Sequence, residues 1–137
     1  MSPGILINID VDDLERATAF YTALLELRVG RRFGEGGVEL VGGAVPFYLL
    51  VKPAGSVVSP ASGERRRYGR HWTPVHLDFV VADVDAAVER ALAAGATLDD
   101  PAATHSWGRI AHLADPFGSG FCLLQFLGRG YDEVASG

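Results

Sequence analysis

The chain has 137 residues, 48% of them apolar, and 12 Lys and Arg against 17 Asp and Glu give a net charge of −5. This length suits one compact domain or two small modules that share a core, and the apolar content excludes intrinsic disorder. The mild acidity argues against a nucleic-acid partner, which would need a basic surface. The single cysteine, Cys122, excludes an internal disulfide.

Two further features concern the cellular compartment. The longest apolar run, at 44–51, is much shorter than a membrane span. Residues 1–3 lead directly into a strand-like run, without the basic segment that opens a signal peptide. We therefore expect a cytoplasmic protein with no membrane partner.

The first half of the chain predicts one helix among strands. A β-branched run at 5–11 is typical of a strand, and Asp12–Glu15 is typical of a helix start. Apolar residues then recur every three or four positions, as on one face of a helix, at Leu14, Ala17, Tyr21 and Leu24. Further strands are predicted at 38–41 and 46–51.

The second half repeats this order. It predicts a strand at 75–81, a helix from Asp83 to Ala94 that ends at Gly95, and closing strands at 107–114 and 121–127. Between the closing strands, Asp115–Gly118 predicts a tight turn because it holds Pro and Gly at suitable positions.

An arginine cluster lies between the two halves, in a stretch rich in Pro, Ser and Gly. It consists of Arg65, Arg66, Arg67 and Arg70. A solvated loop is one interpretation. A loop that binds an anion or a partner is another, because guanidinium groups match carboxylates and phosphates. Internal pairing with acidic residues is a third.

The two halves form an internal repeat. Val11-x-Asp13-Leu14 matches Val81-x-Asp83-Val84 at an offset of 70 residues, and 47–50 matches 121–124 at an offset of 74. We expect an α+β fold of two tandem β-α-β-β-β modules with curved mixed sheets around a cavity. The predicted parts are module one at 5–52, an Arg-rich linker at 53–73, module two at 74–127 and a C-terminal tail at 128–137.

These residues resemble the vicinal oxygen chelate superfamily, which includes glyoxalases, extradiol dioxygenases, epimerases and bleomycin-resistance proteins. The resemblance covers about residues 5–127 and is carried by Val11–Tyr21, Val75–Asp78, Asp115–Gly118 and Phe121–Leu123. It implies the glyoxalase/bleomycin-resistance fold and a homodimer. It does not determine the reaction, since one fold supports many functions. Leu25–Leu27 lacks the glycine that is common in the family, so the first helix is expected to end differently.

Metal-dependent members of the superfamily use four cavity ligands, on the first and last strands of each module. The repeat offsets place these positions at Leu6, His76, Tyr48 and Cys122. Only His76 is a usual ligand in the family, and Leu6 has no donor atom. Tyr48 and Cys122 are not the hard oxygen donors of such sites. A Cys–His pair suits zinc but needs a third ligand, from His71, His105 or His112. We therefore expect no cofactor, with a divalent metal bound through His76 as the less favoured alternative.

Strand periodicity predicts which side chains face the cavity, because alternate residues share a face. If Asp115–Gly118 is a four-residue turn, Arg109 pairs with Leu124 and faces the cavity together with Trp107; a bulge would reverse both. The expected ligand-binding residues are Tyr48, His76, Asp78, Trp107, Arg109 and Cys122. A structural His76–Asp78 pair and a packed loop at Trp107 are the simpler alternatives.

The expected function is metal-independent binding of a small organic molecule, an antibiotic or an aromatic metabolite, in the cavity between the modules. An apolar, aromatic lining with a few polar groups is typical of such sites. The alternative is a lyase or isomerase of the glyoxalase type, with His76 as general base or as part of a divalent-metal site. The sequence leaves open whether the protein is an enzyme.

Overall fold

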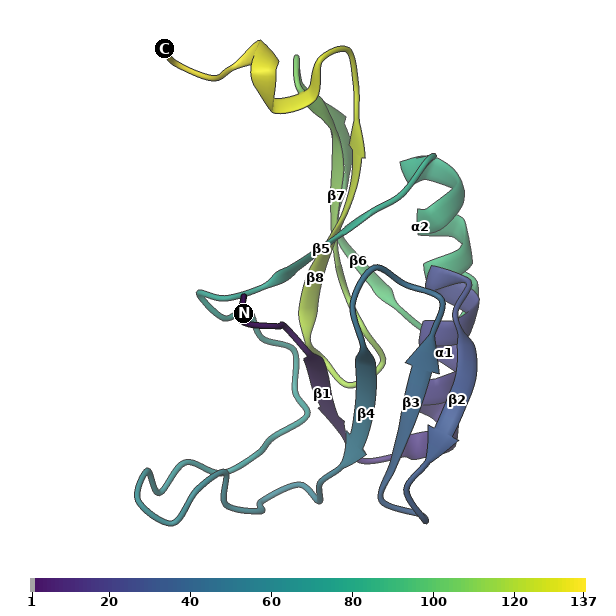
Figure 1. Ribbon diagram of the computed structural model, residues 1–137, viewed down its shortest axis with the longest axis vertical. Helices are drawn as coiled ribbons and strands as arrows, with labels where there is room; N and C mark the ends of the chain where they lie inside the picture. Colours follow the sequence, from purple (N-terminus) through teal and green to yellow (C-terminus); the bar gives the residue numbers. More distant parts are fainter. Residues whose placement is uncertain (1) are drawn as a thin grey trace. The chain divides into compact units, whose positions relative to one another are not determined.

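The computed structural model describes residues 2–137 of the chain. The chain divides into two compact units: the N-terminal unit, which ends at Gly69, and the C-terminal unit, Arg70–Gly137. Each unit contains one α-helix and one mixed sheet of four strands, as Figure 1 shows. The predicted α+β fold of two β-α-β-β-β repeats is confirmed, and neither sheet closes on itself.

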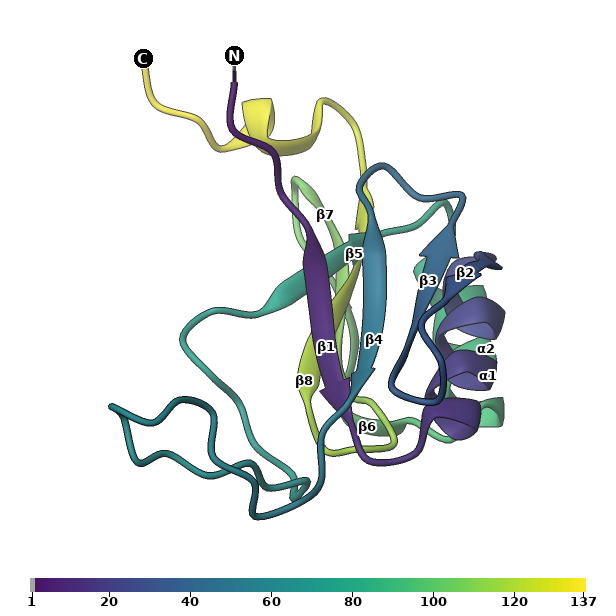
Figure 2. The same cartoon turned by 60° about the horizontal axis from the view of Figure 1, so that its bottom comes forward.

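The N-terminal unit follows the predicted order of elements. These are β1 (Ile7–Val11), α1 (Leu14–Leu25), β2 (Arg28–Arg32), β3 (Gly37–Val41) and β4 (Phe47–Val51). Its sheet has the order β1-β4-β3-β2, in which β1 is parallel to β4 and the other pairs are antiparallel. Figure 2 shows α1 along one side of this sheet.

The C-terminal unit repeats this arrangement. Its elements are β5 (Leu77–Val80), α2 (Val84–Ala93), β6 (Thr97–Thr104), β7 (Gly108–Ala114), β8 (Gly120–Phe126) and a short 3-10 helix (Gly130–Glu133). The sheet order is β5-β8-β7-β6, again with one parallel pair, β5 and β8. Neither helix among residues 2–137 is long and apolar enough to cross a membrane.

An aspartate caps the N-terminus of each helix in the same way. The Asp13 carboxylate accepts a hydrogen bond from the Arg16 amide at 3.0 Å, and the Asp83 carboxylate accepts one from the Ala86 amide at 3.1 Å. Each bond satisfies an amide that has no partner within the helix. The C-terminal caps differ between the helices: Glu26 after α1 has a left-handed conformation with φ 54°, and Ala94 after α2 has a right-handed one. Glu26 thus adopts, without being glycine, the conformation for which a glycine is usual.

In each unit the helix covers one face of the sheet. Ala17, Phe20, Tyr21 and Leu24 are the buried residues of α1. They lie on the side of the N-terminal sheet that carries the paired Val38 and Leu49, both fully buried. In the C-terminal sheet the corresponding pair is Ala111 and Leu123. The opposite face of each sheet has no helix over it from its own unit, and polar side chains gather there.

The strand register confirms the repeat offsets. Ile7 pairs with Phe47 and Leu77 pairs with Phe121, so both predicted offsets relate the same strand pair in the two units. The extra residues of the second copy lie in the longer β6–β7 hairpin, since β6 has 8 residues where β2 has 5.

Two strands, β2 and β6, were missing from the predicted elements. All five residues of β2 are exposed and three of them are arginines, so the strand has no alternation of apolar and polar residues. β6 contains Pro101, and its register with β7 is irregular on either side of Asp100. Both strands lie at sheet edges, where a strand can be short of apolar residues and can hold a proline.

Candidate functional site

A row of four polar residues crosses the helix-free face of the C-terminal sheet. Asp78 on β5 pairs with Cys122 on β8, Cys122 pairs with His112 on β7, and His112 pairs with Asp100 on β6. Directly paired residues of neighbouring strands have adjacent side chains on the same face. The row therefore brings a thiol, an imidazole and two carboxylates together from four strands.

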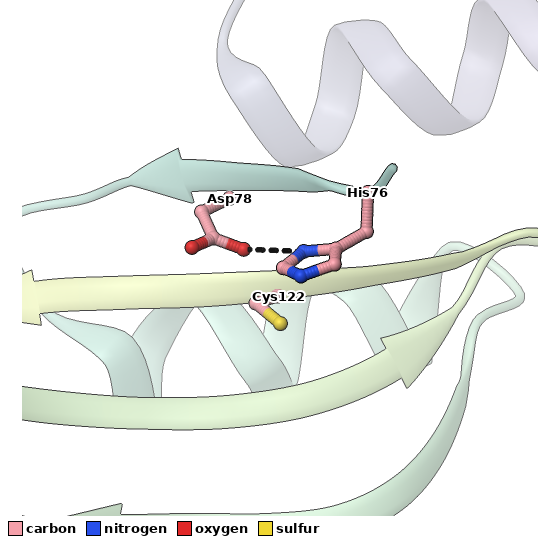
Figure 3. A group of neighbouring side chains, drawn as sticks. All are labelled: His76, Asp78 and Cys122. Carbon is pink, nitrogen blue, oxygen red and sulfur yellow. Dashed lines mark hydrogen bonds and ion pairs between the residues drawn. The ribbon is translucent and has the colours of Figure 1, made fainter. Parts of the chain in front are cut away.

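His76 extends this row at the entry to β5. Its Nδ1 lies 3.0 Å from Oδ1 of Asp78, two residues further along the same strand (Figure 3). The donor atoms of His76, Asp78 and Cys122 all lie within 4.8 Å of one another. Figure 3 shows the imidazole beside the carboxylate, with its second nitrogen on the side of Cys122.

Trp72 lies flat against β8 because residue 120 is glycine. A Cβ atom at Gly120 would be 2.5–2.7 Å from three atoms of the indole, which no side chain allows. Nε1 of Trp72 donates a hydrogen bond to Asp99 at 3.0 Å, and the Arg70 guanidinium lies over the ring at 4.9 Å from its centre. Arg70 also forms a salt bridge with Asp99, so three side chains fix one another.

Trp72 and the polar row form an open pocket of about 240 Å³. Its lining residues are Trp72, His76, Asp100, His112 and Cys122. Trp72 stands edge-on to both imidazoles, with ring centres 6.0 Å from His76 and 5.7 Å from His112. The pocket thus has one aromatic wall, two imidazoles and a thiol floor.

Cys122 is a neutral thiol at physiological pH. Its side chain is 2% exposed, and burial together with the nearby Asp78 carboxylate raises the pKa of Cys122 to about 12. Both effects disfavour the thiolate, the form that attacks electrophiles and binds metals.

The predicted register of β7 and β8 is wrong by one residue. The turn has five residues, because Gly118 has φ 90° and Ser119 accepts a hydrogen bond from the Asp115 amide. The buried Asp115 carboxylate holds the turn by accepting bonds from the amides of Phe117 at 2.8 Å and Ser119 at 3.0 Å. His112 instead of Ala111 therefore pairs with Cys122.

This register places Arg109 on the helix-covered face. Arg109 pairs with Gln125 and donates hydrogen bonds to Asp85 of α2 at 2.9 and 3.2 Å. Trp107 does not line the pocket either: its ring stacks on His105 at 5.1 Å and contacts Tyr131 at 5.5 Å. A strand register that differs by one residue exchanges the two faces, which is the physical reason for the difference.

Tyr48 occupies the equivalent row in the N-terminal sheet. It pairs with Asn8 on β1 and with Glu39 on β3, and its hydroxyl donates to Glu39 at 3.2 Å. The Arg31 guanidinium donates three bonds to the Glu39 carboxylate, at 2.6, 3.1 and 3.2 Å, and the Arg31 amide donates a fourth at 3.1 Å. Those bonds hold the pKa of Glu39 at about 2, well below its usual range.

The arginine cluster is largely bound within the chain. Arg66 donates to Asp10 at 2.7 Å and to the Val57 carbonyl, and Arg65 donates to the Gly55 carbonyl. Arg70 pairs with Asp99. Internal pairing with acidic residues, one of the three interpretations of this cluster, therefore describes two of its four arginines, Arg66 and Arg70.

The donor set does not fit the hard divalent ion of metal-dependent superfamily members. Of the four implied positions, Leu6 has a hydrocarbon side chain with no donor atom. The Tyr48 hydroxyl is hydrogen-bonded to Glu39, and Cys122 is a neutral thiol. The donors that do come together, His76, Asp78 and Cys122, belong to one unit and include a soft sulfur ligand.

Of the six expected ligand-binding residues, the structure brings His76, Asp78 and Cys122 together. Sequence reasoning missed Trp72 and Asp100 and considered His112 only as a third metal ligand. The register of β7 would have revealed His112, and the glycine at position 120 is a cue that an aromatic ring lies close to β8. Neither follows from strand periodicity alone.

Comparisons with known proteins agree with this architecture. Residues 6–124 match the family described as a glyoxalase-like domain. An uncharacterized protein of Mycobacterium tuberculosis, Rv0887c, is 31% identical over 129 residues, which cover 91% of this chain and 75% of that protein. The anthracycline biosynthesis protein DnrV of Streptomyces peucetius is 39% identical over 67 residues, or 49% of this chain and 23% of that protein. The match therefore covers less than a quarter of DnrV.

Solved structures show the same fold. A glyoxalase/bleomycin resistance protein/dioxygenase family enzyme from Burkholderia phytofirmans superposes with a TM-score of 0.71 at 23% identity, over 89% of this chain and 97% of that one. The fosfomycin resistance protein FosX from Mesorhizobium loti gives a TM-score of 0.70 at 19% identity, over 98% and 100%. On the family match and this shared fold, the chain belongs to the glyoxalase-like domain family of the vicinal oxygen chelate superfamily.

Proposed function

We propose that the protein binds a small aromatic molecule in the Trp72 pocket without a metal ion. The observation that carries this proposal is the built aromatic wall. Trp72 is held by Gly120, Asp99 and Arg70 beside two imidazoles that offer hydrogen bonds. A pocket with an aromatic wall and a few convergent polar groups is typical of small-molecule sites.

The names of two relatives suggest which ligands to test first. FosX is a fosfomycin resistance protein and DnrV an anthracycline biosynthesis protein, so antibiotics are a sensible first class of ligands to test. A metal-free site agrees with the donor set at the four implied ligand positions. The homodimer and the cytoplasmic location remain predictions.

A thermal-shift screen of antibiotics and aromatic metabolites in the presence of EDTA tests this proposal. A ligand that binds the native state raises the melting temperature. Trp72→Leu should weaken binding of any hit about tenfold or more, because it removes the aromatic wall. Tyr131→Leu, which removes an exposed aromatic side chain outside the pocket, is the matched control and should leave affinity unchanged. The proposal fails if no compound binds or if both variants bind equally well.

A second function is favoured by the His76–Asp78 contact. A carboxylate that accepts a hydrogen bond from Nδ1 leaves Nε2 free to take a proton, which is the arrangement of a general base. The protein would then be a lyase or isomerase in which Asp78 orients His76. His76→Gln would abolish turnover of a bound compound while retaining its binding. Turnover that persists in His76→Gln would contradict this role.

The convergence of His76, Asp78 and Cys122 also raises the alternative of a soft divalent metal such as zinc. Such an ion would have to displace the Cys122 proton, against the raised pKa of the thiol. Elemental analysis of the purified protein decides this point, since a structural or catalytic zinc ion would be present at one per chain.

A further inference from the structure

We infer that the Trp72 pocket selects planar organic cations over anions of the same shape. This inference rests on the proposed function and names the class of its ligand. It follows from three features of the pocket: the orientation of two imidazoles, the balance of charge, and the way in which the chain's own arginine lies on the aromatic wall.

Each imidazole of the pocket has a carboxylate next to its Nδ1 atom. Nδ1 of His76 lies 3.0 Å from Asp78, and Nδ1 of His112 lies 3.4 Å from Asp100. A carboxylate can only accept a hydrogen bond, so the proton of each neutral imidazole is favoured on Nδ1. Nε2 is then an acceptor in both rings, and the pocket offers lone pairs to a ligand that carries N–H or O–H donors.

The charges around the pocket also favour a cationic ligand. Asp78, Asp99 and Asp100 contribute three carboxylates from β5 and β6, and one guanidinium group, that of Arg70, pairs with Asp99. Carboxylates therefore outnumber guanidinium groups around the pocket by three to one. A ligand cation is attracted to this surface, and a ligand anion is repelled by carboxylates at short range.

Arg70 already shows how this wall binds a planar cation. Its guanidinium lies over the Trp72 ring and pairs with the Asp99 carboxylate, which combines cation–π attraction with a charge-assisted hydrogen bond. Because β8 and Arg70 cover the two faces of the indole, a ligand in the adjacent pocket would use the second element, a carboxylate, which Asp100 supplies. A ligand with an amidine, guanidine or aromatic amine group would pair with Asp100 as Arg70 pairs with Asp99.

Benzamidine and benzoate test the inference, because they have the same planar shape, opposite charge and opposite hydrogen-bonding character. Their affinities for the full chain are measured by calorimetry in EDTA. We expect benzamidine to bind at least about tenfold more tightly, which is what one hydrogen bond to a charged group contributes. Asp100→Asn keeps an acceptor for His112 but removes the charge, and it should reduce this preference several-fold.

Asp132→Asn is the control, since it removes an equal charge from an exposed position in the 3-10 helix of the same unit. It should leave the preference unchanged. Equal affinity for the two probes, tighter benzoate binding, or an equal effect of both variants overturns the inference. If neutral aromatic compounds still bind, the proposed function survives that result; if no compound binds at all, the proposed function fails as well. Benzamidine binding that requires added Zn²⁺ also overturns the inference.

Discussion

His112 on β7 lies directly opposite Cys122 on β8, and this pairing determines which side chains form the candidate site. It places an imidazole beside the thiol on the helix-free face and sends Arg109 to the face covered by α2. The cause is local: a five-residue turn at Asp115–Ser119 that Gly118 and the buried Asp115 carboxylate stabilise.

The register makes opposite predictions for Arg109 and His112. Arg109→Ala should leave ligand affinity unchanged and lower the stability only slightly, because it breaks a partly exposed ion pair with Asp85. His112→Ala should weaken binding by about 1–3 kcal/mol through the loss of a hydrogen bond in the pocket. Calorimetric titration of both variants with one ligand checks this, and weaker binding in Arg109→Ala alone would support the four-residue turn.

Gly120→Ala should displace Trp72. The added methyl group would overlap the indole, so either the ring leaves β8 or the strand shifts, at a cost of about 1–3 kcal/mol. In a Trp107→Phe background, Trp72 is the sole tryptophan, and its emission should shift to longer wavelength as the ring becomes exposed. Gly69→Ala, where a Cβ meets nothing within 4 Å, is the control. Unchanged emission in Gly120→Ala would show that the wall does not depend on this glycine.

Cys122 should react slowly with thiol reagents. Because burial and Asp78 raise its pKa to about 12, almost no thiolate exists at pH 8, and the side chain is covered. Native protein should therefore resist iodoacetamide, whereas protein unfolded in guanidinium chloride should be labelled at once. Mass spectrometry follows the reaction. Rapid labelling of the native chain would mean that the Cys122 thiol is accessible and that its pKa is not raised.

Glu39 should contribute to stability above its ordinary pKa and lose that contribution in acid. Hydrogen bonds from Arg31 lower its pKa from 4.5 to about 2, so the folded state favours the carboxylate. The stabilisation is complete above pH 4.5 and disappears as the pH falls toward 2. The difference in melting temperature between wild type and Glu39→Gln should thus be constant from pH 7 to 5 and shrink at pH 3. A melting-temperature difference that grows as the pH falls would mean that folding raises the pKa of Glu39, which would contradict this prediction.

The sequence predicted those features that depend on neighbouring residues or on the internal repeat. Asp13 and Asp83 identified both helix starts, and the two offsets gave the equivalent strand pairs. The family came from the resemblance of the motifs in both halves, and the family match confirms it. The sequence also placed His76, Asp78 and Cys122 on one face, because the parallel pair β5–β8 has a regular register.

What the sequence did not predict depends on contacts between distant residues. The register of β7 is set by the conformation of Gly118, which the residue type alone permits but does not require. The position of Trp72 depends on its packing against Gly120, 48 residues later in the chain. β2 and β6 lack an apolar pattern because they are edge strands whose pairing is determined by the neighbouring strand.

Metal-free binding at the Trp72 pocket is tested most directly by a fluorescence titration of chelator-treated Trp107→Phe protein. Its metal content is first measured by elemental analysis. A compound from the thermal-shift screen should change the Trp72 emission in a saturable way with less than one metal ion per ten chains present. Binding or turnover that appears only when one equivalent of a divalent metal is restored would contradict this account.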